Sequence, residues 1–485
     1  MKRILRNISL FVLSLGVLLF LIMNIKAFLL SPSSKQSSET LAPKWEEPTE
    51  KKLAELIKIK TISGIEGKFD YHASIFEFLK SRFPNVFSKL QFREDIKEGF
   101  VFVWKSKETA KKSYLFLGHL DVVPVEEESL AQWTRPPFSG EIADGMVWGR
   151  GAFDDKGGSI ALLEAMESLA KSGFVSKNDF YFAFGLDEEI GGMHSAQKIS
   201  AVLAKENLKF DAAFDEGSAI VLDPVNLGPV PVAIIAVGEK GYVSFKLTVE
   251  IPGGHSSIVK PETAISVMTN ALVRLQKNPP PKRMTEATRR MFEVLAPAQN
   301  YFKRLIYSNL WLTEKLILKM ANGSPRFLSI VQSHYVVIQI NSGLKDNVIP
   351  GVATAVVNSR ILPGDTIEDV EKRLDEALGD SRVHVSIIGN FNSAGSAISS
   401  SSGPVYFAIQ NSLKSVFPDA LVAPSISTGA TDSRHYSNLA KEIYRFRPFT
   451  LVPDELSMIH GVNERVKVED LRKAVRVYEH LIQEL

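Results

Sequence analysis

The spacing of apolar positions along the chain changes several times, and each spacing predicts a different kind of element. Uninterrupted apolar runs at residues 114–118, 180–185 and 211–214 are typical of short strands buried on both faces. Residues 158–171 instead carry apolar side chains at helical spacing, and Gly173 is suited to end that helix. This alternation of strands and helices predicts an α/β domain with a doubly wound, mostly parallel sheet.

The pattern changes from about residue 239, where strands and helices follow one another in the order β-α-β-β-α-β. That order predicts an inserted ferredoxin-like α+β domain, which we call the lid domain. Its segments are 243–251, 263–276, 336–341, 354–362, 367–378 and 384–388. Between its first helix and second strand, the proline-led and later strongly apolar segment 278–326 predicts a helical insertion. The apolar residues of this insertion could form a groove for a lipid chain or pack against the lid domain.

A chain of 485 residues is expected to contain about two to four domains, which agrees with an insertion of one domain into another. We expect the chain to divide into an N-terminal apolar segment at 1–30, a linker at 31–49, a first part of the catalytic domain at 50–238, the lid domain at 239–392 with its helical insertion near 278–326, and a second part of the catalytic domain at 393–485.

The N-terminal segment has the length of a membrane span. Lys2, Arg3 and Arg6 precede an uncharged apolar run at 8–25, and about 20 apolar residues cross a bilayer. Positive charge before the run favours a cytoplasmic N-terminus and an extracytoplasmic catalytic part. The alternative is a cleaved signal peptide and a secreted protein, although the sequence near Ala27 is a poor cleavage site. Both interpretations place the globular part across a membrane.

Composition and charge then exclude several kinds of chemistry. Lys and Arg number 57 against 55 for Asp and Glu, so the net charge of +2 gives no indication of a nucleic-acid partner. The chain contains no cysteine, which excludes disulfides, thiolate metal sites, cysteine nucleophiles and iron–sulfur clusters. A metal ion in this protein must therefore be held by histidines and carboxylates.

Five short stretches combine such ligands, and each can be interpreted as a loop directly after a strand. They are Leu-Gly-His-Leu-Asp at 117–121, Gly-Arg-Gly-Ala-Phe-Asp-Asp-Lys-Gly at 149–157, Leu-Asp-Glu-Glu-Ile-Gly-Gly at 186–192, Phe-Asp-Glu-Gly at 214–217 and Ile-His-Gly-Val-Asn-Glu at 459–464. Taken singly, each stretch has an ordinary structural interpretation: a surface histidine with an Asp turn for the first, a helix cap for the second, a solvated acidic loop for the third, a turn for the fourth and a structural histidine for the fifth. Strand ends of an open α/β sheet line one crevice, so distant stretches can converge there. Two histidines and several carboxylates, with one carboxylate left over as a base, suit a pair of zinc ions.

The order of these stretches resembles the co-catalytic dizinc peptidase family that includes aminoacylase, carboxypeptidase S and bacterial glutamate carboxypeptidase. The resemblance extends from about residue 50 to the C-terminus. Within the family, the chain most resembles carboxypeptidase S and the secreted branch that makes and cleaves N-fatty-acyl amino acids. Further matching stretches lie at 133–140, 239–241, 347–350 and 431–434. The resemblance implies an α/β catalytic domain with an inserted lid domain.

The resemblance also implies a site with two Zn²⁺ ions or other divalent metals. The metal ligands that it implies are His119 and Glu216 for one ion, Glu189 and His460 for the other, and Asp154 as the bridge. Asp121 would orient His119, and Glu188 would be the general base that takes a proton from the bridging water and returns it to the leaving amine.

The lid domain would complete the site by the same resemblance. His255 matches a histidine that stabilises the oxyanion, and Asn347, Arg360 and Gly429 match positions that bind substrate, with Arg360 suited to its carboxylate. In simple dimeric members this histidine comes from the partner subunit. A homodimer through the lid domain is therefore expected, and whether His255 acts within its own chain or across the dimer stays open.

The function implied is hydrolysis of an amide bond beside a free carboxylate, in N-acyl or fatty-acyl amino acids or in short peptides. Alternatives are a carboxypeptidase or dipeptidase, and an enzyme that runs the same reaction towards synthesis of N-acyl amino acids. A non-catalytic, membrane-tethered receptor is a more remote alternative, since loss of activity should have removed a ligand or the base and none is missing.

Overall fold

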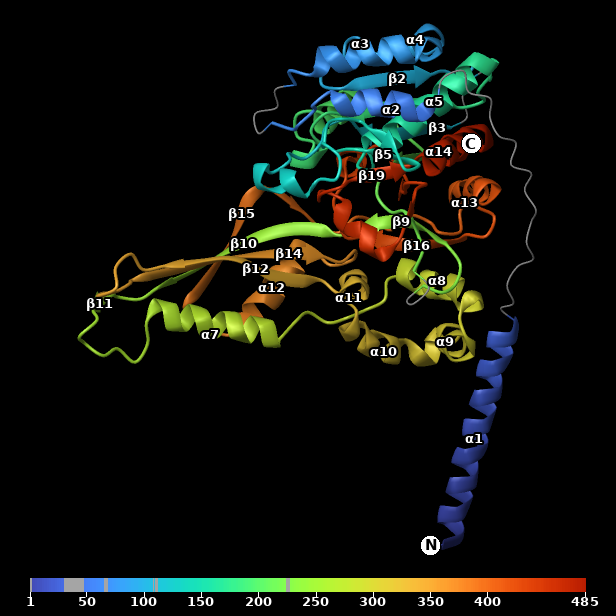
Figure 1. The fold of residues 1–485 in the computed structure, drawn as a ribbon. Coiled ribbons are helices and arrows are strands. Elements are labelled where there is room, and N and C mark those ends of the chain that lie inside the picture. The colour runs from blue at the N-terminus through green and yellow to red at the C-terminus, as the bar shows by residue number, and fades with distance from the viewer. Residues whose placement is uncertain (1, 30–47, 65–68, 108, 110–111, 224–226) are drawn as a thin grey trace.

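The computed structural model describes residues 2–29, 48–64, 69–107, 109, 112–223 and 227–485 (Figure 1). A long N-terminal helix, α1 (Lys2–Leu29), stands beside an α/β body, and an elongated lid domain extends from that body (Figure 1). Nearly all of the linker expected at 31–49 lies outside the described residues; Thr49 already begins helix α2 (Thr49–Lys58).

The body is built on a 10-stranded sheet with the order β1-β2-β6-β3-β7-β17-β9-β8-β18 and with β16 paired to β9. Its strands are β1 (Gln91–Phe92), β2 (Phe100–Trp104), β3 (Ser113–His119), β6 (Asp179–Gly185), β7 (Ala212–Asp215), β8 (Ile220–Val221), β9 (Val232–Glu239), β16 (Leu421–Ser427), β17 (Ile443–Arg445) and β18 (Thr450–Leu451). The central strands β6, β3, β7 and β17 are mutually parallel, whereas β2 and β1 are antiparallel additions at one edge. The predicted α/β fold class is thus confirmed.

Alternate side chains of the central strands enter two different cores, because successive residues of a strand point to opposite faces. Tyr114 and Phe116 of β3 pack into the larger core, and Leu115 and Leu117 pack into the smaller one. The larger core is covered by α2, α3 (His72–Arg82), α4 (Pro84–Lys89), α5 (Lys156–Ser172), α13 (Pro404–Val416) and α14 (Val468–Glu484), and the smaller one by α6 (Ala196–Lys205). Burial on both faces explains why these strands are continuously apolar.

The lid domain has the predicted ferredoxin-like order. Its four antiparallel strands lie in the order β12-β14-β10-β15, and two helices pack on one face. The elements are β10 (Gly241–Glu250), α7 (Ala264–Lys277), β12 (His334–Ser342), β14 (Val352–Ile361), α12 (Ile367–Leu378) and β15 (Val383–Ser393). Buried and more exposed residues alternate along β10 and β14, as expected for a sheet with one covered face.

The segment 278–326 folds into helices, but it does not pack against the lid core as one of our two interpretations expected. Its helices are α8 (Glu286–Leu295), α9 (Tyr301–Tyr307) and α10 (Leu310–Met320), and α11 (Pro325–Val331) follows. Phe292, Leu310 and Ile317 form a separate core with Val232 of β9 and Ala423 of β16. The insertion therefore extends the body, because strands β9 and β16 offer an apolar face that the other helices leave uncovered.

Candidate metal centre and active site

Parallel pairing of three central strands brings three of the five stretches to one edge of the main sheet. Along the β3–β6 pair, His119 lies opposite Gly185, and along the β3–β7 pair, Phe116 lies opposite Phe214. His119 ends β3, Glu188 and Glu189 follow β6, and Glu216 follows β7. The chain after each of these strands therefore emerges at the same edge, as expected for an open α/β sheet.

A small antiparallel sheet brings the other two stretches to this edge. Its strands are β4 (Ile142–Ala143), β5 (Met146–Trp148) and β19 (Arg465–Lys467), and the loop with Asp154 follows β5. The buried Glu464, just before β19, accepts backbone hydrogen bonds from Gly151, Phe153 and Asp154 and pairs with Arg150 at 2.7 Å. Glu464 therefore fastens the Asp154 loop to the segment that carries His460.

Asp154 lies between two imidazoles. Its Oδ1 is 3.2 Å from His119 Nε2, and its Oδ2 is 3.5 Å from His460 Nε2. Glu189 Oε2 is 3.0 Å from the same nitrogen of His460. Ligand atoms of His119, Asp154 and Glu189 all lie within 4.8 Å of one another. The structure thus brings together four of the five predicted metal ligands by direct contact.

Glu216, the fifth predicted ligand, joins this group through Arg447. One guanidinium nitrogen of Arg447, Nη2, lies 2.7 Å from Glu216 Oε2 and 2.9 Å from Asp154 Oδ1, and Nε lies 3.1 Å from Asp155 Oδ1. Arg447 is buried, and its positive charge offsets three carboxylates. Our sequence analysis missed this residue; the signal available was an arginine two positions after a short strand, β17, that ends at the same sheet edge.

Asp121 connects His119 with the acidic loop that carries Glu188 and Glu189. Its Oδ1 is 3.4 Å from His119 Nδ1, and its two oxygens accept hydrogen bonds from the backbone N–H groups of Glu188 and Glu189. The hydroxyl of Ser63 donates a further hydrogen bond to it at 2.5 Å. A buried carboxylate with these partners fixes both the imidazole orientation and the position of the loop.

The tight turn after Glu189 requires glycine. Gly192 has φ of +66°, and a Cβ there would lie 2.2 Å from Asp432 Oδ1 and 3.0 Å from His435 Nε2. Asp432 is buried, and burial together with Asp215 and Asp121 raises its pKa well above the ordinary range. The close approach of this acid to the loop is a tertiary feature that the sequence did not reveal.

The electrostatics of the cluster favour cations. Hydrogen bonds to Asp154 and Glu189 raise the pKa of His460 to about 10. Burial alone would lower the pKa of His119, but hydrogen bonds to Asp121 and Asp154 hold it well above its usual value. Imidazoles that retain protons so strongly indicate an excess of negative charge around them.

The carboxylates show the same excess of charge. Burial raises the pKa of Glu188 well above its ordinary value, against the effect of His119, and Glu216, Asp432 and Glu189 add to the rise. Burial also raises the pKa of Glu216, although Arg447 opposes it. Among the described residues, the buried Glu189 Oε1 has no hydrogen-bond partner. Two imidazoles, several carboxylates and an unsatisfied acidic oxygen are a donor set that fits zinc or another divalent cation.

The residues predicted on the lid domain lie apart from this cluster. His255 belongs to the exposed two-residue strand β11 (Gly254–His255), which pairs with β13 (Val348–Ile349), and the backbone oxygen of Asn347 accepts a hydrogen bond from Ser256 N–H. Figure 1 shows β11 at the far end of the lid domain. Arg360 instead lies near the body, with its guanidinium 4.9 Å from the ring centre of Tyr242.

Gly429 lies in an exposed loop after β16, and a Cβ built on it would meet open space. The surface beside Gly429 is therefore free for another group.

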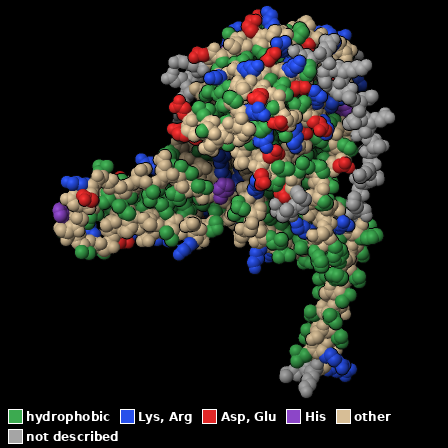
Figure 2. All heavy atoms as spheres, in the orientation of Figure 1, with side chains coloured by type: hydrophobic (Ala, Val, Ile, Leu, Met, Phe, Trp, Pro, Cys, Tyr) green, Lys and Arg blue, Asp and Glu red, His purple; other side chains and the backbone are tan. Residues whose placement is uncertain are grey.

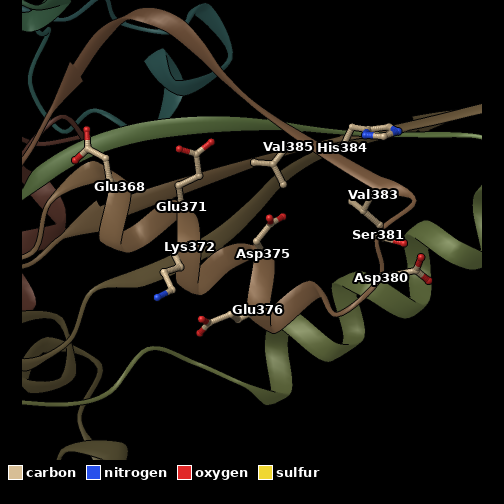
Figure 3. Close-up of a pocket in the computed structure, with 10 residues that line it drawn as sticks. All are labelled: Glu368, Glu371, Lys372, Asp375, Glu376, Asp380, Ser381, Val383, His384 and Val385. Carbon is tan, nitrogen blue, oxygen red and sulfur yellow. The ribbon is translucent and has the colours of Figure 1, made fainter.

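A hollow of about 770 Å³ elsewhere on the lid domain contains none of the predicted residues. It is lined by acidic side chains of α12 and by the first residues of β15 (Figure 3). That hollow is separate from the candidate active site.

A group of imidazoles and mostly buried carboxylates at the edge of a parallel sheet, with an inserted lid domain, defines a metal-dependent hydrolase. The chain belongs to peptidase family M20/M25/M40, whose sequence profile matches residues 115–484. The predicted resemblance to this metal-dependent family is confirmed.

Individual relatives agree with this assignment. The chain is 36% identical over 497 residues to a probable carboxypeptidase S-like 2 of Dictyostelium discoideum, with 99% of this chain and 93% of the relative covered. It is 36% identical over 456 residues to the N-fatty-acyl-amino acid synthase/hydrolase PM20D1 of Xenopus tropicalis, with 92% and 88% covered. An M20 family metallo-carboxypeptidase of Sulfolobus solfataricus has the same fold, with a TM-score of 0.65, 19% identity and 90% and 99% coverage.

Proposed function

We propose that this protein is a zinc-dependent hydrolase that cleaves the amide bond beside a free carboxylate, in N-acyl or N-fatty-acyl amino acids or in short peptides. The observation that carries the proposal is the position of Asp154, which directs one carboxylate oxygen towards His119 and the other towards His460. The names of the two relatives, a carboxypeptidase S-like protein and an N-fatty-acyl-amino acid synthase/hydrolase, support both substrate classes.

Two metal positions follow from this arrangement. His119, Glu216 and Asp154 would hold one ion, and His460, Glu189 and the same Asp154 would hold the other. Ions held there would polarise the scissile carbonyl and make a water molecule more acidic. Zinc is the preferred occupant because nitrogen and oxygen donors in a cysteine-free chain suit it.

Glu188 is the proposed general base. Burial raises the pKa of Glu188, which favours uptake of a proton by this carboxylate during the reaction. Glu188 takes a proton from water while the water oxygen bonds to the carbonyl carbon, and it later delivers this proton to the amide nitrogen as the carbon–nitrogen bond breaks. Asp121 supports this role because it holds the backbone N–H of Glu188 at 3.2 Å.

Three further residues are proposed to bind the substrate. The guanidinium of Arg360 can bind the free carboxylate through two parallel hydrogen bonds, and it is half-buried at the body end of the lid domain. The exposed loop with Gly429 offers backbone groups to the substrate. Asn347 lies with His255 at the far end of the lid domain and would contact the substrate in the site of a second copy.

His255 is proposed to reach the active site of a second copy. It is exposed at the far end of the lid domain, away from the cluster of its own chain (Figure 1). A homodimer through the lid domain would place this imidazole where it can donate a hydrogen bond to the developing oxyanion.

The proposed location is the extracytoplasmic side of a membrane. In the part of the chain that the structure describes, α1 is the one helix long and apolar enough to cross a bilayer, with a mean hydropathy of 2.6 over residues that are not buried in the protein. Lys2, Arg3 and Arg6 precede the apolar run and favour a cytoplasmic N-terminus.

The substitution Glu188→Gln tests the mechanism. We expect kcat on an N-acyl amino acid to fall by about 10²–10⁴-fold, the usual contribution of a general base, while the zinc content stays unchanged. The matched control is Glu128→Gln, an exposed glutamate outside the cluster, which should retain full activity. A Glu188→Gln variant with the wild-type rate would show that another group accepts the proton.

A substrate panel tests the substrate class. N-acyl amino acids of graded acyl length and dipeptides are compared with their methyl esters, which lack the free carboxylate. We expect each ester to lose most of its kcat/KM relative to the acid, and the preferred member of the panel to distinguish aminoacylase from carboxypeptidase activity. Fatty acid mixed with amino acid tests synthesis by the same site. Failure to turn over either class would refute the proposed function.

A further inference from the structure

Helix α10 presents apolar side chains on two opposite faces. Leu310 and Ile317 point into the body and are buried. Trp311, Leu312, Leu316 and Met320 recur at helical spacing on the other face and are about half-exposed, with Trp311 at 53% and Met320 at 56%. The first face packs the body. The second face is left about half-exposed within the described residues, and four large apolar side chains on the outer side of a helix are unusual for a surface in contact with water.

The exposed face of α10 also contains two lysines. Lys315 and Lys319 are exposed and one turn apart, and at 3.6 residues per turn they project within this face, between Trp311 and Leu316. Phe302 on the preceding helix α9 is 75% exposed and adds a further apolar side chain. Apolar and aromatic side chains interleaved with lysines, whose long stems let the ammonium groups reach the headgroups, are compatible with a helix that lies in the headgroup region of a bilayer.

The exposed face of α10 adjoins the C-terminal end of α1. The Tyr301 hydroxyl donates a hydrogen bond to Asn24 Oδ1 at 2.6 Å, and Asn309 Nδ2 donates one to the backbone oxygen of Met23 at 3.1 Å. The ammonium group of Lys26 is 5.9 Å from the centre of the Trp311 ring. In Figure 1, α9 lies next to the upper end of α1 with α10 beyond it, and Figure 2 shows hydrophobic side chains continuing from α1 onto the underside of the body.

We propose that the exposed face of α10, together with Phe302, lies in the headgroup and upper acyl region of the bilayer that α1 crosses. The inference rests on the proposed membrane span of α1. Lys26 and Asn24 mark the point where the apolar helix leaves the hydrocarbon, so a helix held against them lies at the depth of the headgroups. Trp311 and the two lysines are the residue types favoured at that depth. The body is therefore held by two contacts, with one side fixed towards the membrane.

The first test measures the depth of Trp311 in the full-length protein. The protein is reconstituted into phosphatidylcholine–phosphatidylglycerol vesicles in which some lipids carry bromine near the top of the acyl chain. The fluorescence of Trp311 is the difference between wild type and Trp311→Phe; α1 contains no tryptophan that would interfere. We expect this component to lose intensity with brominated lipid and to be shielded from aqueous acrylamide. A Trp311 component that responds only to acrylamide would overturn the proposal.

The second test uses Leu312→Glu/Leu316→Glu, two changes on the exposed face that leave Leu310 and Ile317 in place. Backbone hydrogen exchange over 310–320 should be slowed by vesicles in the wild type and unaffected by them in this variant. The matched control, Leu130→Glu/Val175→Glu, places glutamates at exposed apolar positions of the body away from α10 and should behave as wild type.

The two tests separate the possible failures. If the full-length protein does not float with vesicles in a density gradient, the proposal that α1 spans the membrane is wrong, and so is the proposed contact of α10 with the bilayer. If the protein floats but Trp311 and residues 310–320 are unchanged by lipid, only the contact of α10 is wrong. Protection that appears only at many copies per vesicle would show that a second copy covers this face, which would also overturn the proposal. None of these outcomes depends on catalytic activity, so they are distinguishable from failure of the proposed hydrolysis.

Discussion

The sheet edge of the body and the far end of the lid domain carry proposed catalytic residues in opposite environments. At the sheet edge, the side chains of His119 and Asp121 are 1% and 0% exposed, and several hydrogen bonds fix them. At the far end of the lid domain, His255 is exposed and belongs to a strand of only two residues. The body thus holds a preorganised charged centre, whereas His255 of the lid domain could take up its proposed role only by meeting the site of a second copy.

Removal of Asp154 should have the largest effect, because this carboxylate is the proposed ligand shared by both metal positions. In Asp154→Ala we expect loss of bound metal and a fall in kcat/KM of at least about 10³-fold, which corresponds to several kcal/mol of lost charge stabilisation. Metal analysis of the purified variant and steady-state kinetics measure the two effects. Full metal content with normal turnover would show that the cluster is not the metal centre.

Removal of His255 should have the next largest effect and tests whether the lid domain acts across a dimer. In His255→Ala we expect kcat to fall by about 10²–10³-fold, the usual cost of one oxyanion donor, with metal content unchanged. Mixing this variant with Glu188→Gln should restore activity at about one quarter of the sites, because each mixed dimer contains one site with both intact residues. Absence of recovery in confirmed mixed dimers would mean that His255 acts within its own chain or not at all.

A smaller effect is expected from Asp121→Asn, which leaves all proposed ligands in place. The amide keeps the size of the carboxylate but removes the charge that orients His119, so metal affinity should fall by about 10–100-fold. Competition with a chromogenic chelator measures this. Ser63→Ala removes only the hydroxyl that donates to Asp121 and should cost less than Asp121→Asn. Equal affinities in all three proteins would argue against a role of Asp121 in the metal centre.

The smallest effect on turnover is expected from Arg447→Met, whose main consequence should be on stability. The metal-free protein should lose about 3–5 kcal/mol of unfolding free energy, because Asp154, Asp155 and Glu216 lose their buried cation. The metal-loaded protein should lose less, because bound cations neutralise some of the same carboxylates. Thermal unfolding with and without metal compares the two; an equal loss in both states would show that Arg447 and the metals act on different charges.

Much of the fold could be predicted because its elements have local signals. The run at 114–118 lies within β3, and the helical spacing over 158–171 became α5, which ends at Gly173 in the left-handed conformation. The ferredoxin-like order of the lid domain could also be predicted from the sequence. The packing of the insertion was not, because Phe292 and Ile317 are apolar whether they meet the lid domain or strands β9 and β16.

The candidate site was predictable to a similar extent. Acids and histidines that follow predicted strands could be expected to lie together at one edge of the sheet, because the carboxyl ends of parallel strands meet there. Arg447 gave no comparable signal, because an isolated arginine after a short strand is most often a surface residue. Its burial among carboxylates depends on β17 lying next to β7, a pairing between residues more than two hundred positions apart.

The sequence by itself determined which residue types the protein can use for chemistry: it has no cysteine, and its histidines and acids stand in short stretches after apolar strands. The tertiary structure alone decided how they are arranged, with Asp154 between two imidazoles, Arg447 beside Glu216, and His255 far from both. The physical reason is that strand and helix signals act over a few neighbouring residues. The distances within a charged cluster are set instead by strand pairings and core packing between segments remote along the chain.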